Sequence, residues 1–151
     1  MSRASQKPLN FEALADFRYA IRRYLNFSER NARKAGLEPQ QYQALLAIKG
    51  LADLQSATIG VLAERLQIQH HSAVELMDRL EKRGMIRRHR SRSDRRKVLV
   101  ELTKRGEAKL MRISLSHRDE LQVAGRKLLR ALEGFISHNG SRSAGKTRRR
   151  G

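Results

Sequence analysis

The fold of this protein is decided by residues 59–106, which read IGVLAERLQIQHHSAVELMDRLEKRGMIRRHRSRSDRRKVLVELTKRG. Apolar residues recur at helical spacing over 60–66 and again over 70–83, and these two segments are separated by only about three residues. Ser56 or Thr58 is placed to cap the first of them. The pattern therefore predicts two short helices joined by a tight turn.

The apolar period changes toward two after Gly84. Residues 85–89 and 97–102 are short strand-like runs, and the segment 90–96 between them is polar and turn-forming. The two runs are therefore predicted to pair as a β-hairpin. Two consecutive helices followed directly by a basic hairpin are typical of a winged helix-turn-helix.

Longer helices are predicted on both sides of this stretch. Apolar spacings of three and four predict a helix over 11–35, and a proline at the first helical position begins another over 39–49. Thr103 is placed to cap a helical region over 104–137, in which Gly125 is a candidate break, so two helices are expected there. The predicted fold class is mainly α with a small β-hairpin wing.

The domain organisation follows from length and composition. A chain of 151 residues favours one domain, which is expected over residues 11–137 with the winged helix-turn-helix at about 39–103. The flanking helical regions are 11–35 and 104–137. Residues 1–10 are expected to be flexible. The last segment, 138–151, is rich in Gly, Ser and Arg and predicts a disordered basic tail.

The charge of the chain is strongly positive and unevenly distributed. The formal net charge is +18, and residues 82–97 hold nine basic residues against one acid, Asp94. Residues 140–151 add five basic residues and no acid. A basic excess gathered on one segment is the electrostatic footprint of nucleic-acid binding. The predicted partner is therefore a polyanion. Because the basic hairpin follows a helix-turn-helix, we expect this polyanion to be double-stranded DNA.

Two surfaces are predicted to contact DNA. A helix N-terminus in the major groove presents side chains to base edges, and arginines on a thin loop can enter the minor groove. Asp94 would either hold the Arg96 guanidinium or simply form the turn. Arg83, Arg87 and Arg88 are expected near phosphates. The predicted contacts are Gln69, His70, His71, Ser72 and Arg79 in the recognition helix and Arg90, Arg92, Asp94, Arg95, Arg96 and Lys97 in the wing.

These segments resemble the multiple-antibiotic-resistance regulator (MarR) family. The likeness covers about residues 11–137 and is most specific at Asp78-Arg79-Leu80-Glu81 to Gly84 and at Asp94 with Arg96. It implies a homodimer whose first and last helices intertwine while two winged lobes read a palindromic operator. It also implies a transcriptional regulator, here expected to be a repressor, released by a small aromatic or anionic effector. The alternative is an architectural protein that binds nucleic acid without sequence preference through its wing and tail.

Three positions depart from the family's pattern. Gln67 stands in the turn, where the family often has Gly, and Gln69 stands where it often has a capping Ser. A weaker cap is therefore expected, with Gln69 directed to DNA. Glu75 stands where the family often has a basic or polar residue that contacts DNA, and it is left out of the contact set. Its carboxylate could pair with Arg79 at i,i+4 or accept a hydrogen bond from a cytosine amine.

Effector and dimer contacts are named as candidates on chemical grounds. Tyr, Arg and His side chains can line a cavity for an aromatic acid, although tyrosines at such positions are more often core or interface packing. The effector candidates are Tyr19, Arg22, Tyr42, His117 and Arg118, and the dimerisation candidates are Phe11, Leu14, Phe17, Leu121, Leu128, Leu132 and Phe135.

No catalytic, metal or cofactor site is predicted, and the protein is not expected to be an enzyme. The chain has no cysteine, which excludes thiol catalysis and thiol redox sensing. His71 and Glu75 share a helix face but lack a third ligand, and no nucleophile elbow or Gly-rich phosphate loop occurs. No apolar run approaches the ~20 residues that span a bilayer. A cytoplasmic, nucleoid-associated protein without a membrane partner is expected.

Overall fold

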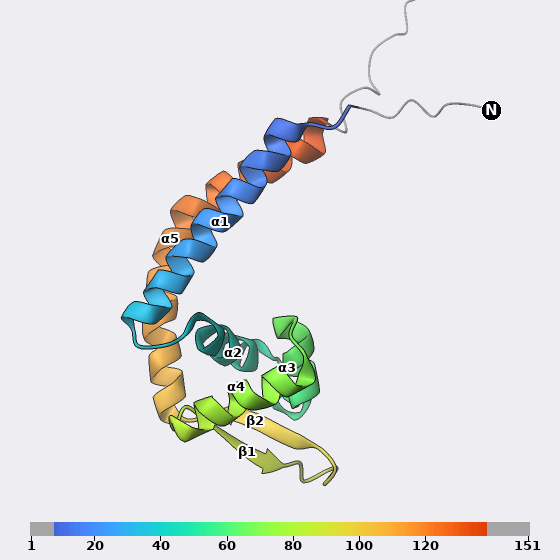
Figure 1. Cartoon of the computed structure of the whole chain (residues 1–151), viewed down its shortest axis with the longest axis vertical. Coiled ribbons are helices and arrows are strands. Elements are labelled where there is room, and N and C mark those ends of the chain that lie inside the picture. The colour runs from blue at the N-terminus through green and yellow to red at the C-terminus, as the bar shows by residue number, and fades with distance from the viewer. Residues whose placement is uncertain (1–7, 139–151) are drawn as a thin grey trace, which may run out of the picture. The chain divides into compact units, whose positions relative to one another are not determined.

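The computed structural model describes residues 8–138. Its elements follow in the order α1 (Phe11–Lys34), α2 (Pro39–Gly50), the short 3-10 helix η1 (Leu54–Ser56), α3 (Ile59–Leu66), α4 (His70–Lys82), β1 (Ile86–Arg90), β2 (Val98–Leu102) and α5 (Lys104–His138), as labelled in Figure 1. The predicted fold class, mainly α with a hairpin wing, is confirmed. The basic tail expected over 138–151 lies outside the described residues, apart from residue 138.

The described chain divides into two compact units. Residues 28–117 form the first, which we call the winged unit, and residues 8–27 together with 118–138 form the second, which we call the helical pair. Helices α1 and α5 each contribute one part to either unit. Each unit has its own internal contacts.

Helix α5 is continuous, whereas the sequence predicted two helices over this region. It runs for 35 residues through Gly125 without a break. A glycine inside a helix costs only about 1 kcal/mol relative to alanine, which is too little to interrupt a long amphipathic helix. The prediction of two helices was therefore wrong.

Side-chain caps mark the beginnings of two helices in the winged unit, α3 and α5. Thr58, rather than Ser56, caps α3, and its Oγ1 accepts a hydrogen bond from the Val61 amide at 3.3 Å. Thr103 caps α5 as predicted, because its Oγ1 accepts from the Gly106 amide at 3.1 Å. Its hydroxyl also donates to the carbonyl of Gly84 at 2.6 Å. Thr103 therefore joins the start of α5 to the end of the α4 segment.

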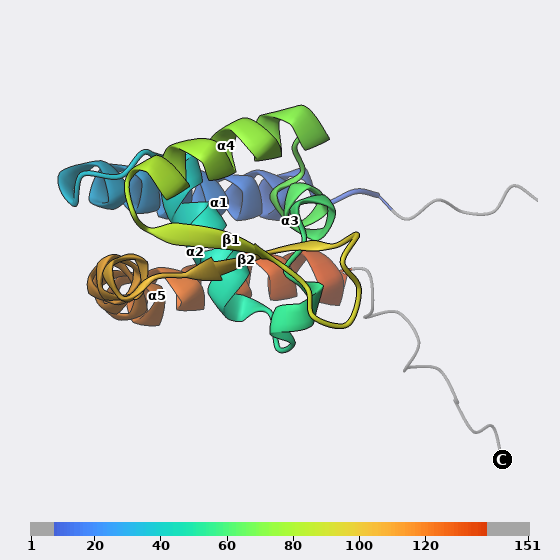
Figure 2. The same cartoon turned by 90° about the horizontal axis from the view of Figure 1, so that it is seen from below.

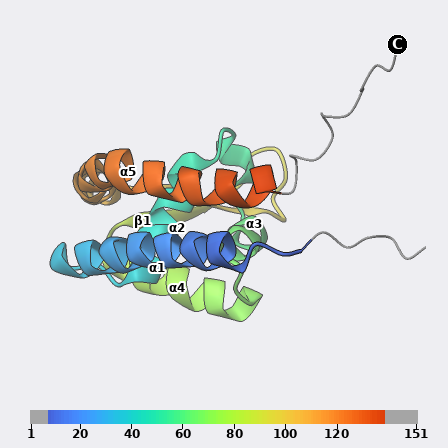
Figure 3. The same ribbon diagram turned by 90° about the horizontal axis from the view of Figure 1, so that it is seen from above.

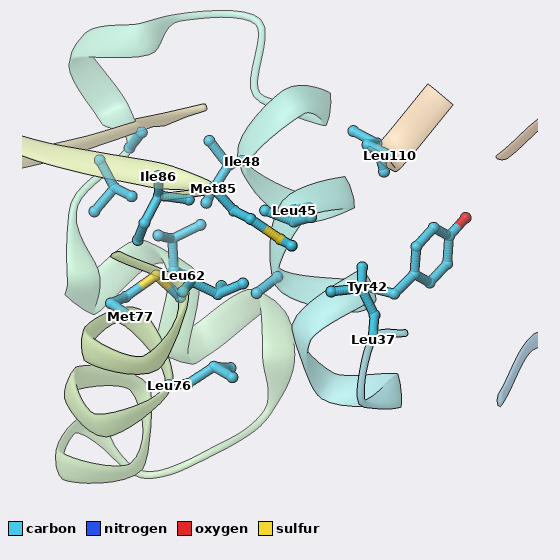
Figure 4. Packing of buried hydrophobic residues seen from close by; sticks show 14 of the residues in the cluster. Leu37, Tyr42, Leu45, Ile48, Leu62, Leu76, Met77, Met85, Ile86 and Leu110 are labelled. Carbon is cyan, nitrogen blue, oxygen red and sulfur yellow. The ribbon is translucent and has the colours of Figure 1, made fainter. Parts of the chain in front are cut away.

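The core of the winged unit lies between its helices and the hairpin. Leucine, isoleucine and methionine side chains from α2, α3, α4, β1 and the start of α5 meet there (Figure 4). Burying each such side chain stabilises the fold by about 1.5–3 kcal/mol. The labelled members of this core are Leu37, Tyr42, Leu45, Ile48, Leu62, Leu76, Met77, Met85, Ile86 and Leu110.

The hairpin is antiparallel and its register is regular, from Ile86 opposite Leu102 to Arg90 opposite Val98. Side chains alternate between the two faces of a strand. The first, third and fifth residues of β1 therefore lie on one face, and Arg87 and His89 lie on the other. The Val100 amide donates to the Ala57 carbonyl at 2.9 Å, which fixes β2 to the segment before α3.

Gly106 lies closely against the backbone at the start of the hairpin. A Cβ at this position would lie 2.0 Å from the carbonyl oxygen of Met85. The first turn of α5 therefore packs directly on the backbone at the start of the hairpin. Only glycine leaves room for that contact.

The helical pair consists of the first part of α1 and the last part of α5. Figure 3 shows the two segments side by side, and a Cβ added at Gly134 would lie 3.9 Å from the Ala13 Cβ. Many of its apolar side chains are exposed, including Phe11 at 71% and Val123 at 62%. Within residues 8–138, no helix has the length and apolar content needed to cross a membrane.

Candidate nucleic-acid interface

The N-terminus of α4 presents polar side chains that the fold leaves exposed. Gln69 is the N-cap residue and makes no side-chain capping hydrogen bond, which agrees with the weaker cap predicted from its sequence. Gln69, His70 and His71 are exposed and Ser72 is half-buried. Gln67 adopts the left-handed conformation at φ 54°, a geometry that glycine adopts more easily. The turn therefore holds a strained residue where the resembled family often has glycine.

Arg79 lies further along α4 and is also exposed. It pairs with Glu75 one turn earlier, with Arg79 Nη2 3.7 Å from Glu75 Oε2. Both side chains are 66% exposed, so the pair contributes little to stability. The i,i+4 pairing considered for Glu75 is present. It leaves the Arg79 guanidinium accessible to an additional acceptor.

The wing tip is organised around a buried serine that sequence reasoning missed. The Ser91 side chain is 3% exposed, and its hydroxyl donates to Gln55 Oε1 of η1 at 3.2 Å. The same hydroxyl lies 3.4 Å from the Asp94 amide, and the Ser91 amide donates to the Lys97 carbonyl at 2.9 Å. No signal in an Arg-rich run distinguishes this serine from its exposed neighbour Ser93, because the burial depends on η1.

Asp94 acts mainly as the turn-forming residue of the wing. Its Oδ1 accepts from the Arg96 amide at 3.1 Å, whereas the Arg96 Nε is 4.0 Å away. The Arg96 side chain is 97% exposed, so no fork holds its guanidinium. Of the two roles considered for Asp94, the turn is the one with a hydrogen bond. Arg96 extends from the wing tip into solvent.

The other wing candidates surround the same tip. Arg90, at the end of β1, donates from Nη1 to the Arg95 carbonyl at 3.0 Å. The side chains of Arg92, Arg95 and Lys97 are exposed. In Figures 1 and 2 the hairpin tip and the beginning of α4 lie at the same end of the winged unit. The two predicted contact surfaces therefore face a common side.

Three arginines expected near phosphates make hydrogen bonds or ion pairs within the protein, and one of them, Arg87, keeps a 72% exposed side chain. Arg83 donates to Gln41 Oε1 and to the Gly36 carbonyl, both at 2.7 Å, so it joins the end of α4 to the turn between α1 and α2. Arg87 pairs with Glu101 on the neighbouring strand. Arg88 pairs with two carboxylates of α4. The sequence could not show this, because the acceptors come from other elements.

The five effector candidates are not gathered in one unit. Tyr42 and His117 belong to the winged unit, where both are buried and their rings stack at 4.8 Å between centroids. His117 Nδ1 lies 2.8 Å from the Ile113 carbonyl oxygen. Tyr42 and His117 are therefore part of the packing. The remaining candidates, Tyr19, Arg22 and Arg118, belong to the helical pair.

A cavity of about 410 Å³ lies in the helical pair beside Tyr19. Its lining includes three cationic side chains and two carboxylates, and Val123 contributes apolar surface; the charged residues are Arg23, Lys127, Arg130, Asp16 and Glu120. The Arg23 guanidinium carbon is 6.0 Å from the centre of the Tyr19 ring. Among the effector candidates only Tyr19 lines this cavity.

The dimerisation candidates all lie on α1 and α5 and are at least partly accessible. Phe11, Leu14 and Leu121 are exposed, and the other four are half-buried, namely Phe17, Leu128, Leu132 and Phe135. Over residues 8–138, no group of three or more His, Asp or Glu side chains is arranged to hold a metal ion. His71 and Glu75 accordingly have no third ligand within that range.

Comparison with known proteins agrees with this geometry. The family model described as MarR family matches residues 35–97. A MarR family protein from Bacillus stearothermophilus is 20% identical, with a TM-score of 0.66 over 86% of this chain and 99% of that chain. A mutant of S. aureus MepR bound to an oligodeoxyribonucleotide is 18% identical, with a TM-score of 0.60 over 87% of this chain and 94% of that chain.

A third structure, a mutant of MarR from E. coli complexed with operator DNA, is 21% identical, with a TM-score of 0.62 over 82% of this chain and 89% of that chain. Comparison with curated proteins finds no match. The family model thus matches residues 35–97, the part of the chain that holds the helix-turn-helix and most of the hairpin, and the described residues have the winged-helix fold of these structures.

Proposed function

We propose that this protein is a sequence-specific DNA-binding transcriptional regulator that reads a palindromic operator as a homodimer. One observation carries the proposal: the exposed polar start of α4 and the exposed arginines of the wing tip lie at the same end of the winged unit (Figures 1 and 2). A helix start and a thin basic loop fit neighbouring major and minor grooves of one duplex. Two similar solved structures contain an oligodeoxyribonucleotide or operator DNA.

The proposed contact set is the one predicted from the sequence, and Arg83 and Arg88, whose guanidinium groups bond within the protein, are not assigned to phosphate. Gln69, His70, His71 and Ser72 would meet base edges, and Arg79 would meet phosphate. The wing would supply its exposed cations to the minor groove and its walls, with Asp94 shaping the loop. With two lobes related by a dyad, the half-sites would lie about 10 bp apart.

The homodimer proposal rests on the helical pair. Its apolar side chains include Phe11 at 71% exposed, Val123 at 62% and Ile136 at 59%. Apolar surface of this extent on two long helices is typical of an interface with another subunit. A second copy of the chain is the occupant we propose for it.

The effector proposal rests on the cavity beside Tyr19. Three cationic groups, those of Arg23, Lys127 and Arg130, line it against two carboxylates, and with the aromatic ring of Tyr19 this net positive lining suits a small aromatic acid. Repression relieved by such a compound is the regulation we propose. A thermal-shift screen of aromatic acids tests it, because a ligand that binds the folded state raises the melting temperature.

The central test selects duplexes from a random pool with the full chain and then compares two variants on the recovered duplex. Arg96→Ala is expected to weaken binding about tenfold or more, since a groove contact is worth ~1–3 kcal/mol. Arg126→Ala removes the same charge from an exposed site of the helical pair and is expected to change affinity less than twofold. Equal effects of the two substitutions would contradict groove entry by the wing.

The selected duplex also distinguishes the sequence-specific regulator from the alternative, an architectural protein that binds without sequence preference. Deleting residues 140–151 removes five basic residues and no acid. A sequence-specific regulator retains its preference for the selected duplex over random duplex after this deletion. Parallel loss of specific and random binding would favour the architectural protein, because charge alone then accounts for the affinity.

A further inference from the structure

Arg88 occupies a special position in the wing. It is the third residue of β1, opposite Val100, and on the same face of the strand as the buried Ile86. This face is turned toward α4, since both acceptors of the Arg88 side chain belong to that helix. The Arg88 side chain is only 27% exposed, whereas that of its neighbour Arg87 is 72% exposed.

The guanidinium of Arg88 bridges two carboxylates. Arg88 Nη2 lies 2.6 Å from Asp78 Oδ1, and Arg88 Nε lies 2.6 Å from Glu81 Oε2. Asp78 and Glu81 are three residues apart on α4 and therefore share one face of the helix. Charge-assisted hydrogen bonds of this length are the strong ones among polar contacts. The hydrogen bond with Glu81 is the main reason that the pKa of Arg88 is raised above its usual value, although burial acts against it.

These two contacts join the recognition helix to the wing. Among residues 8–138, both ion pairs between an α4 side chain and the hairpin use Arg88. The neighbouring Arg87 pairs with Glu101 across the hairpin and leaves the helix untouched. The other ties between these elements are apolar packing, in which Met77 and Leu80 of α4 share the core with Ile86 of β1, and backbone contacts near the turn, such as the Met85 amide donating to the Leu80 carbonyl at 3.0 Å. Apolar packing has no fixed direction, so Arg88 supplies the directional side-chain contact further along the hairpin.

A small rotation of the hairpin would misplace the wing tip. The tip lies about four residues beyond Arg88, or ~13 Å along an extended strand. A tilt of ~5° about this point then moves the tip by roughly 1 Å, which exceeds the ~0.5 Å tolerance of a preorganised site. The side chain that fixes the tilt therefore affects whether both surfaces fit one duplex.

We propose that Arg88 is a positioning residue for DNA recognition, which through Asp78 and Glu81 fixes the wing relative to the recognition helix and makes no phosphate contact itself. This inference rests on the proposed DNA-binding function. According to this inference, the carboxylates of Asp78 and Glu81 increase the affinity for DNA. Their charge alone would have the opposite effect, because carboxylates repel phosphates.

The double variant Asp78→Asn with Glu81→Gln separates the two effects by sign. It removes two negative charges from the helix that faces DNA, so charge alone predicts tighter binding. Loss of the bridge predicts weaker binding. We expect affinity for the selected duplex to fall about tenfold, with no decrease in the slope of log affinity against log salt. A lost phosphate contact would instead lower that slope by ~0.9.

Two further variants complete the experiment. Arg88→Lys keeps the charge but cannot bond both carboxylates in one plane, and a fall in affinity of about tenfold is expected. Arg87→Lys is the matched control on the adjacent exposed residue, with less than a twofold change expected. Circular dichroism checks folding, and Glu81→Gln alone, expected to weaken binding about threefold, serves if the double variant unfolds.

The outcomes distinguish this inference from the function on which it rests. If the unaltered chain selects no duplex, the proposed function fails before any variant is compared. If the chain binds its duplex and the carboxamide variants bind equally or more tightly, the positioning role of Arg88 is overturned. If Arg88→Lys binds like the unaltered chain, the bridge geometry is not needed and the inference is equally overturned.

Discussion

The winged unit and the helical pair differ in where their apolar side chains lie. In the winged unit, large residues from several elements are almost fully buried, among them Leu45, Leu62 and Met77. Among the described residues of the helical pair, only Ala13 is buried, while Phe11 and Val123 are more than half exposed. The winged unit therefore has a core of its own. The helical pair has an exposed apolar surface, which is the basis of the proposed dimer.

Several polar side chains of the winged unit likewise find their partners within that unit. Arg83 and Lys109 donate to carbonyls at the end of the α1 segment, at 2.7 Å and 2.8 Å. Arg88 joins the hairpin to α4. Internal ties of this kind hold the presented surfaces in place. The surface proposed to recognise DNA therefore stands on a packed unit, and the surface proposed for assembly on a unit with few buried side chains.

The largest effect is expected from Gly106→Ala, which tests the packing of the winged unit. The added Cβ would lie 2.0 Å from the Met85 carbonyl oxygen, so the start of α5 must shift from the hairpin. We expect the free energy of unfolding to fall by about 3 kcal/mol, the upper part of the usual range for overpacking. Urea denaturation followed by circular dichroism measures it.

Gly60→Ala is the matched control for that substitution. Gly60 also lies in the first turn of a helix of the winged unit, and a Cβ there meets nothing within 4 Å. Its replacement is expected to be neutral or to stabilise by up to about 1 kcal/mol. Similar urea midpoints for the two variants would show that the structure accommodates a Cβ at Gly106 without loss of stability.

The sequence predicts the elements of the winged unit well, because their signals are local. Helix periods, the change of period after Gly84 and the capping position of Thr103 are all contained in short segments. The continuity of α5 was missed because glycine is a weak breaker whose effect depends on the length of helix around it. The α4 surface was predicted from residue types alone, and Gln69 at its start is exposed in the structure.

The roles of several cationic side chains were not predictable, because they depend on contacts between distant segments. Arg83, Arg88 and Arg96 look alike in a basic run. In the fold, the first bonds to residues more than 40 positions earlier, the second bonds to α4, and the third is 97% exposed. His117 likewise gives no sequence signal for its stacking on Tyr42. Positions in a charge cluster thus become distinct only through tertiary structure.

An intermediate effect is expected from removing apolar surface in the helical pair. Leu121→Asn with Val123→Asn alters two side chains that are 42% and 62% exposed. If a second copy covers them, each loses roughly 1–2 kcal/mol of apolar burial. We expect self-association to weaken at least tenfold, with the unfolding midpoint of the winged unit unchanged. Sedimentation over a range of protein concentrations measures the association.

Leu46→Asn provides the control in the winged unit. Leu46 is 47% exposed on α2, so the same kind of apolar surface is removed from the other region. No change in self-association is expected from it. If both sets of substitutions weaken association equally, or neither does, the helical pair is not the interface and the proposed dimer is wrong.

The smallest effect is expected from Gly125→Ala, in the part of α5 that belongs to the helical pair. A Cβ at Gly125 meets nothing within 4 Å, so the substitution adds helix propensity without a clash inside the chain. We expect helix stability to rise by about 0.5–1 kcal/mol, seen as a higher melting temperature at fixed concentration. Unchanged self-association would show that the space beside Gly125 is left open by the second copy. Weakened association together with a lower melting temperature would contradict the prediction, because a partner helix must then pack closely on this glycine.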